Sequence, residues 1–221
     1  GSPTLNNHIL SGFSTSNYAI LPETFSPGSN TWEMVFKFTT GDSFTNSNPI
    51  FSKIFNTYYG FRMTIDITGY MYYLLSWSAT DYVEPTPTIA LSTNTTYLIR
   101  ATFDGSSYTF DLSDDNGETW NTDVSVTSSN TLYTFTANSM LGAGGTVRTI
   151  GNATIDLSEC YIKINGFYFW EGIDVTDNVD AVLTSPINNS LIDGQWVNLN
   201  QTVISSAVSL NGSSDISYTI K

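Results

Sequence analysis

The sequence predicts an all-β chain folded as a two-sheet antiparallel sandwich, and three observations support this prediction. Aromatic residues make up 14% of the 221 residues, whereas charged residues make up only 12%. Aromatic residues and Thr favour a half-buried pleated surface, while long solvated helices are normally built from Glu, Lys, Ala and Leu. Short alternating segments also follow one another with turn residues between them, and no window shows a helical period. This pattern is typical of a sandwich or barrel.

The clearest strand signals are Trp32–Phe38 and Phe61–Ile67. Successive strand residues point to opposite faces, so every second residue of a half-buried strand is apolar. We therefore expect these side chains to face the core: Trp32, Met34, Phe36, Phe38, Phe61, Met63, Ile65 and Ile67.

Other segments complete the expected strand set. Tyr70–Trp77 is apolar on both faces, which is typical of a central strand or of one that carries a binding face. Asp104-Gly105 and Asn165-Gly166 are hairpin turn signals. The remaining expected strands are Thr96–Phe103, Tyr108–Leu112, Thr131–Phe135 and two within Ile155–Trp170.

The composition changes after Gly172, where most aromatic residues disappear and Asp, Asn and Ser increase. We therefore predict one sandwich domain over residues 1–172 and a small C-terminal β appendage, or a linker to a further module, over 173–221. A strand-like segment at the very end of the chain indicates adjacent domains in a longer protein.

The charge balance excludes several partners. Twenty acidic residues against seven basic ones give a net charge of −13, which repels nucleic-acid backbones and anionic membrane surfaces. No apolar run reaches membrane-spanning length, so membrane insertion is not expected. The single cysteine, Cys160, lies in an apolar strand pattern and is expected to be a small buried side chain.

The stretch from Tyr18 to Gly172 resembles the laminin-G-like, concanavalin-A-like jelly-roll superfamily. The residues that carry the resemblance are Trp32–Phe38, Tyr97–Gly105, Tyr108–Trp120, Ile155–Gly166 and Phe169–Gly172. The closing segments are similar to the final strands of modules in phage virion proteins and bacterial surface proteins. The resemblance implies a jelly-roll sandwich in an extracellular setting, on a virion or a bacterial cell surface. The superfamily includes glycan binders, protein binders and decoration modules, so the fold alone leaves the function open.

One segment, Ser113–Trp120, matches the Asp-box pattern S-x-D-x-G-x-T-W. Its fixed residues are Ser113, Asp115, Gly117, Thr119 and Trp120. In sialidases the motif is a structural hairpin away from the catalytic site, and we expect the same role here. Asp115 would accept hydrogen bonds within the turn, and Gly117 would supply a positive φ.

Aromatic side chains concentrate between residues 58 and 82 and predict a glycan-binding surface. Sugar rings stack on aromatic rings, and their hydroxyls bond to polar neighbours. We expect Trp77 and Tyr82 to be the main contacts, because they flank the polar loop 78–81. The further predicted site residues are Tyr59, Tyr73, Arg62 and Asp66. The alternative is that about half of these rings belong to the core, on alternating positions.

Catalysis and metal binding find little support. Glycoside hydrolysis needs two facing carboxyl groups, and no strand carries a suitably spaced glutamate pair. A Ser-His-Asp triad would depend on His8 alone. Calcium remains open, because laminin-G-like modules often hold one through aspartates, and Asp104, Asp156 and Asp174 are the candidates.

The function predicted from the sequence is therefore a non-catalytic, lectin-like carbohydrate-binding module. The alternative is a structural or protein-binding module, such as a decoration or fibre domain that forms homo-oligomers and has no glycan site. A hydrolase is the third and weakest hypothesis.

Overall fold

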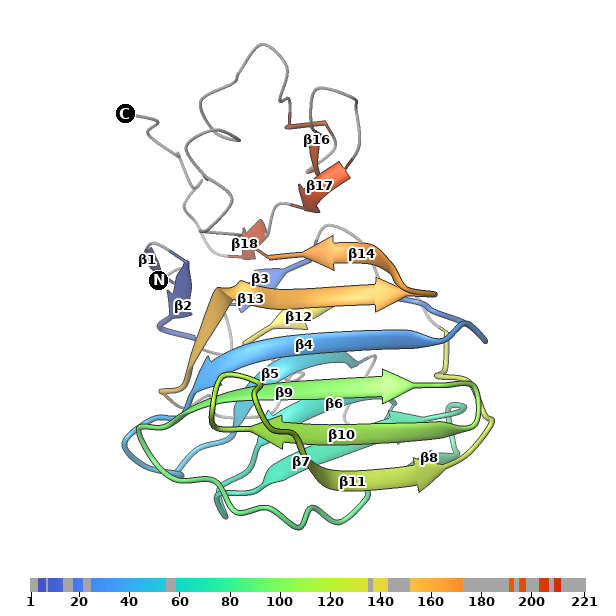
Figure 1. Cartoon of the computed structure of the whole chain (residues 1–221), viewed down its shortest axis with the longest axis horizontal. Coiled ribbons are helices and arrows are strands. Elements are labelled where there is room, and N and C mark those ends of the chain that lie inside the picture. Colours follow the sequence, from blue (N-terminus) through green and yellow to red (C-terminus); the bar gives the residue numbers. More distant parts are fainter. Residues whose placement is uncertain are drawn as a thin grey trace.

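The computed structural model describes residues 4–6, 8–13, 18–21, 25–54, 59–134, 137–142, 152–172, 191–192, 195–197, 203–206 and 209–211. These residues form strands and loops and no helix, so no membrane-spanning helix occurs among them. Two antiparallel sheets stack face to face, as the sequence predicts (Figure 1).

The first sheet has eight strands and lies at the front in Figure 1. Its order is β1-β2-β13-β4-β9-β10-β11, and β14 pairs with β13 beside this path. The strands are β1 (Thr4–Asn6), β2 (Ile9–Ser11), β4 (Trp32–Thr39), β9 (Thr96–Phe103), β10 (Ser107–Ser113), β11 (Asn121–Thr127), β13 (Thr154–Ile164) and β14 (Phe167–Glu171).

The second sheet has seven strands in the order β18-β3-β12-β5-β6-β7-β8. They are β3 (Tyr18–Ile20), β5 (Asn48–Ile54), β6 (Gly60–Ile65), β7 (Met71–Ser76), β8 (Tyr82–Val83), β12 (Met140–Leu141) and β18 (Ser209–Asn211). A small third sheet joins β15 (Leu191–Ile192), β16 (Gln195–Val197) and β17 (Val203–Ser206). The segment after Gly172 thus contributes short strands, and one of them, β18, pairs with β3.

Aromatic rings fill the space between the two large sheets. Phe36 of β4 stacks on Phe51 of β5 with centroids 5.3 Å apart. Tyr73 of β7 lies 4.2 Å from Phe110 of β10. Such offset and edge contacts add to the burial of each ring, so the high aromatic content is used mainly for the core.

The expected alternation is confirmed along β4 and β6. All the residues expected to face inward are buried, with one exception. Ile67 is 58% exposed, because β6 ends at Ile65 and the chain then turns through Thr68 and Gly69. Cys160 is buried as predicted, and burial raises the pKa of its thiol above the usual range.

The strand expected at Thr131–Phe135 is wrong for residues 131–134, which form a loop. Leu132 is buried there, and the Tyr133 N–H donates to the Ser76 carbonyl oxygen at 2.7 Å. The apolar residues of this segment therefore anchor a loop. Several strands were not anticipated, among them β5 and β11. The strand β5 is buried on both faces and includes polar residues, whereas β11 is mostly polar.

A buried polar contact ties the two sheets together at one edge. The Tyr73 hydroxyl donates to Asp123 Oδ2 of β11 at 2.7 Å. The other oxygen of Asp123 accepts from the Thr88 and Ile89 N–H groups, both at 2.6 Å. Because buried polar groups need partners, this arrangement fixes the loop before β9 against both sheets.

Candidate functional site

The predicted aromatic region forms the hairpin from β7 to β8. The Trp77 N–H donates to the Asp81 carbonyl oxygen at 2.8 Å, and Ser78 Oγ accepts from the Asp81 N–H at 3.0 Å. Serine hydroxyls often stabilise tight turns in this way. The turn sets the register in which Ser76 of β7 lies opposite Tyr82 of β8.

Three polar or aromatic side chains lie together at this edge of the seven-stranded sheet. Tyr82 is 43% exposed, Glu84 is exposed and Tyr72 is half-buried. The Tyr72 hydroxyl donates to Glu84 Oε1. Burial, together with this hydrogen bond, raises the pKa of Tyr72 to about 12, so the phenol remains a donor at neutral pH. We call Tyr72, Tyr82 and Glu84 the β8 surface.

Two predicted contact residues are placed where no surface ligand can reach them. Tyr73 is fully buried between the sheets, and Arg62 is only 1% exposed. The prediction is wrong for both. Tyr73 lies two residues after the inward-facing Met71, so the alternation of β7 turns it toward the core as well. The guanidinium of Arg62 lies 4.5 Å from the ring centre of Tyr72, so it supports the β8 surface from beneath.

The other predicted site residues do not form one platform. Trp77 packs on the core residue Tyr108, with centroids 5.0 Å apart, and thus lies on the opposite side of the hairpin from Tyr82. Tyr59 is half-buried just before β6. Asp66 lies at the other end of that strand, about 23 Å away at about 3.3 Å per residue. There it accepts a hydrogen bond from Thr68 Oγ1 at 3.3 Å.

The segment 113–120 forms the hydrogen-bonded turn that its sequence pattern predicts. Asp115 accepts from the Thr119 N–H at 2.9 Å, and Ser113 Oγ accepts from the Gly117 N–H at 2.8 Å. The hydrogen bonds from Ser113 and Thr119 lower the pKa of Asp115 to about 2. Gly117 has φ +84°, in the region that favours glycine.

Trp120, at the end of this turn, lies under Arg100 of β9, whose guanidinium carbon is 4.3 Å from the ring centre. Arg100 also forms a 2.8 Å ion pair with Asp111. The carboxylate of Asp115 and the ring of Trp120 are therefore both engaged within the protein, which fits a structural role for the turn.

Sequence analysis missed a second group of half-exposed rings, on the outer face of the eight-stranded sheet. The ammonium of Lys163 lies 4.6 Å from the ring centres of both Tyr161 and Tyr168. The Tyr161 hydroxyl donates to Glu33 Oε1 at 2.8 Å. The Asn165-Gly166 turn could have revealed this group, since a two-residue turn pairs Lys163 with Tyr168 across the hairpin.

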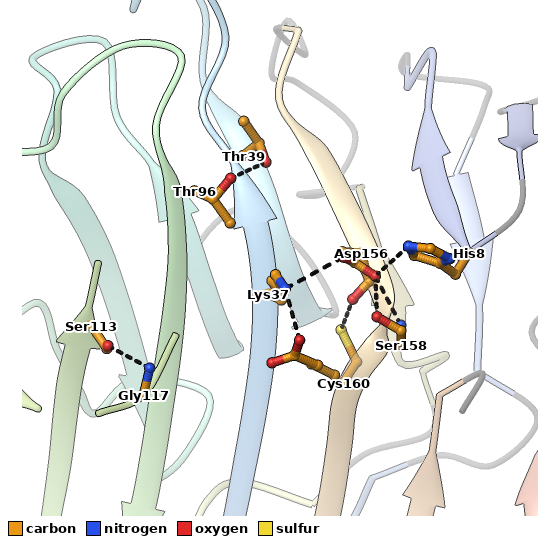
Figure 2. A network of polar contacts seen from close by, with 10 residues as sticks. His8, Lys37, Thr39, Thr96, Ser113, Gly117, Asp156, Ser158 and Cys160 are labelled. Atoms are coloured by element: carbon orange, nitrogen blue, oxygen red, sulfur yellow. Dashed lines mark hydrogen bonds and ion pairs between the residues drawn. The ribbon is translucent and has the colours of Figure 1, made fainter. Parts of the chain in front are cut away.

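Two of the three calcium candidates, Asp104 and Asp156, are engaged with donors in the protein. Asp104 accepts from Ser106 and Ser107 within its own turn. Asp156 faces His8 at 3.5 Å and Lys37 at 3.7 Å, which are nitrogen-bearing side chains (Figure 2). Among the described residues, no three His, Cys, Asp or Glu side chains are grouped to hold a metal ion. Asp174 lies outside the described residues. So does Tyr58, the first aromatic residue of the predicted glycan-binding region.

Figure 2 also shows how Ser158, His8 and Asp156 lie relative to one another. The Ser158 hydroxyl donates to Asp156 Oδ1 at 2.6 Å, and His8 contacts the same oxygen. A nucleophilic triad needs the imidazole between the hydroxyl and the carboxylate. Here the carboxylate lies between the other two groups, so this arrangement does not activate the serine.

The comparisons with known proteins identify the fold. No protein-family model matches the chain, and no curated protein matches its sequence. Among solved structures, the mouse laminin α1 chain, domains LG4-5, has a TM-score of 0.51 at 15% identity over 76% of this chain. The CBM40 of the Ruminococcus gnavus IT-sialidase, bound to α2,3-sialyllactose, has a TM-score of 0.50 at 12% identity over 70% of this chain.

This chain covers 44% of the laminin chain and 91% of the CBM40 chain. At such low identity the likeness shows the fold. The fold is a two-sheet antiparallel jelly-roll sandwich similar to that of the laminin LG4-5 domains, as the sequence resemblance implies.

Proposed function

We propose that the protein is a non-catalytic carbohydrate-binding module that binds glycan at the β8 surface. The observation that carries this proposal is the exposed ring of Tyr82 on the same edge as the Tyr72–Glu84 hydrogen-bonded pair. A sugar needs an apolar ring face to stack on and polar groups to receive its hydroxyls. The β8 surface offers both within two neighbouring strands.

The comparisons support a binding role through the fold. One of the similar structures is a CBM40 bound to α2,3-sialyllactose. Because one fold carries many functions, the likeness supports a lectin-like role only together with the surface chemistry. The engaged carboxylates of Asp123, Asp156 and Glu33 support a role without catalysis, since each already accepts a hydrogen bond from the protein.

We further propose that the module belongs to a phage virion protein or a bacterial surface protein and works outside the cell. A single weak sugar site gains avidity when many copies are displayed together, as on a particle or a cell surface. Immunogold labelling of whole virions and of intact bacteria from the source tests this setting. Labelling confined to the cell interior would contradict it.

The binding proposal is tested with a glycan array followed by titration calorimetry of the best neutral oligosaccharide. We expect Tyr82→Ala to weaken binding about tenfold or more, because it removes the stacking surface. The control is Ile67→Ala, since Ile67 is an exposed apolar side chain that lies outside the β8 surface. Equal affinity in wild type and Tyr82→Ala would overturn the assignment of the β8 surface.

One observation favours the alternative of a structural or protein-binding module. Phe167, at the tip of the β13–β14 hairpin, is 79% exposed, and aromatic side chains are enriched at protein–protein interfaces. Light scattering tests this alternative. A homo-oligomer that dissociates in Phe167→Ser, together with an array showing no bound glycan, would favour it over carbohydrate binding.

A further inference from the structure

The outer face of the eight-stranded sheet carries a cation held between two tyrosine rings. Lys163 of β13 lies 4.6 Å from the centres of Tyr161 and Tyr168, and the two rings meet edge to face at 5.9 Å. This lysine is half-buried, while Tyr168 is 55% exposed. The rings therefore hold the ammonium in place and leave an open ring beside it.

Lys163 differs from the two other cations that the structure describes on the same face, Lys37 and Arg100. Lys37 forms a 2.7 Å ion pair with Glu159, and Arg100 forms one with Asp111 at 2.8 Å. Within the described residues, no carboxylate lies within ion-pair distance of the Lys163 ammonium. The residue opposite Lys163 on β4 is Glu33, whose Oε1 accepts from the Tyr161 hydroxyl.

The neighbouring positions on this face are suited to hydroxyl groups. The strand register places Tyr168, Lys163, Glu33 and Thr102 in one row across β14, β13, β4 and β9. Adjacent strands lie about 4.8 Å apart, so the row extends about 14 Å, enough for more than one sugar residue. Glu33 and Thr102 are half-buried and can exchange hydrogen bonds with a ligand at the surface.

We infer that Tyr161, Lys163 and Tyr168 form a second carbohydrate site, which binds a sugar that carries a carboxylate. The ammonium of Lys163 pairs with the carboxylate, and the open face of Tyr168 stacks on the C–H face of the sugar ring. Glu33 accepts a hydroxyl at the next position of the row. This site lies on the opposite sheet from the β8 surface, so it goes beyond the function proposed above.

Carboxylated sugars come from two common sources, uronic acids and sialic acids. The probes are therefore trigalacturonate and N-acetylneuraminic acid, each compared with its methyl ester, which keeps the sugar and removes the charge. Titration by NMR at low salt should show tighter binding of at least one acid than of its ester, by about tenfold. The preference should decrease between about 0.02 M and about 0.5 M NaCl, because salt screens exposed charges.

Three variants test whether the preference for the acid over its methyl ester arises at this site. Lys163→Met removes the charge and keeps the apolar stem, so it should bind acid and ester equally. Lys163→Arg should retain the preference. The control, Lys37→Met, removes a cation of the same face that is already paired with Glu159, and should also retain it.

Equal binding of acid and ester by the wild type, or an acid preference that survives in Lys163→Met, would overturn the inference. Absence of binding by both acids would overturn it as well. The proposed function is judged separately, by the effect of Tyr82→Ala on a neutral oligosaccharide. The two proposals are therefore tested independently, and either one can be contradicted while the other is supported.

Discussion

The outer faces of the two sheets differ in how much of their surface meets solvent. On the eight-stranded sheet, Lys37, Arg100 and Lys163 are all partly exposed. On the seven-stranded sheet, β5 and β6 are buried on both faces. Arg62 and Arg100 illustrate this difference. Each lies over an aromatic ring, and the guanidinium carbon is 4.5 Å and 4.3 Å, respectively, from the ring centre.

Arg62 is 1% exposed, whereas the Arg100 side chain is 30% exposed. The same local contact thus belongs to a packed layer in one sheet and to an open surface in the other. Only an open face can present a row of side chains to a ligand, while on the other sheet the ligand surface is confined to the β8 edge. Residue type and ring contact therefore do not by themselves indicate a binding surface.

Replacing each of the two arginines with alanine should change stability most. Arg62→Ala should lower the free energy of unfolding by about 3 kcal/mol, as is typical of losing a large buried side chain. Arg100→Ala should cost about 1 kcal/mol, because its ion pair and ring contact are partly solvated. Urea unfolding with unchanged m-values measures both. Equal losses would show that the two faces are equally open.

A smaller change in the free energy of unfolding is expected at Tyr73, and it depends on alkaline pH. Burial, and the charge of Asp123, raise the pKa of Tyr73 well above its ordinary value. The unfolded chain loses this proton near pH 10, so the stabilisation by Tyr73 is complete below about pH 10 and decreases above it. Tyr73→Phe should be about 1–2 kcal/mol less stable at pH 7, since Asp123 loses a donor.

Tyr73→Phe should also lose less stability than the wild type between pH 9.5 and pH 11. Urea unfolding at a series of pH values measures this difference. Parallel pH profiles for the two proteins would contradict the burial of this phenol between the sheets.

A smaller effect should distinguish two threonines that face outward on the two sheets. Thr64 of β6 is fully buried, and its hydroxyl has no hydrogen-bond partner in the described structure. Thr64→Val should therefore stabilise the protein by about 1 kcal/mol. Thr102→Val, at a half-buried position of the open face, should change stability by less than about 0.5 kcal/mol. Thermal unfolding compares them, and a destabilised Thr64→Val would argue against a sealed outer face.

The smallest effect is expected at the 113–120 turn, which positions Trp120 beneath Arg100. The pKa of Asp115 is lowered to about 2, so its stabilisation is present above about pH 4 and is lost as the pH falls through about 2. Asp115→Asn should reduce the loss of thermal stability between pH 4 and pH 2. The exposed neighbour offers the control Asp114→Asn. An identical effect of both substitutions would show that the turn hydrogen bonds are not responsible.

Much of the sandwich could be predicted because local patterns and packing agree there. The alternation in β4 assigns Trp32, Met34, Phe36 and Phe38 to the core, and all four are buried. The Asn165-Gly166 pair predicts the β13–β14 hairpin, and both residues have positive φ. In contrast, β5 was missed because Ser52 and Lys53 are buried in it, and no period-two pattern remains.

The candidate site was less predictable, since it depends on which face of β7 is inward. Both faces of this strand are apolar, so the sequence did not distinguish Tyr72 from Tyr73. Trp77 and Tyr82 flank one loop, yet the hairpin register places them on opposite sides. The site at Lys163 depends on partners from two strands, which become neighbours only through sheet pairing. The division at Gly172 remains a prediction.

We propose that aromatic rings left outside the core bind sugar. The most direct test is a ¹H–¹⁵N correlation titration of the wild-type protein with its best neutral oligosaccharide. We predict saturable shifts that centre on Tyr82, Val83 and Glu84 and leave the backbone of β4 and β9 unchanged. Saturable shifts elsewhere, with none at these three residues, would contradict the account, as would a protein that shows no shifts with any glycan tested.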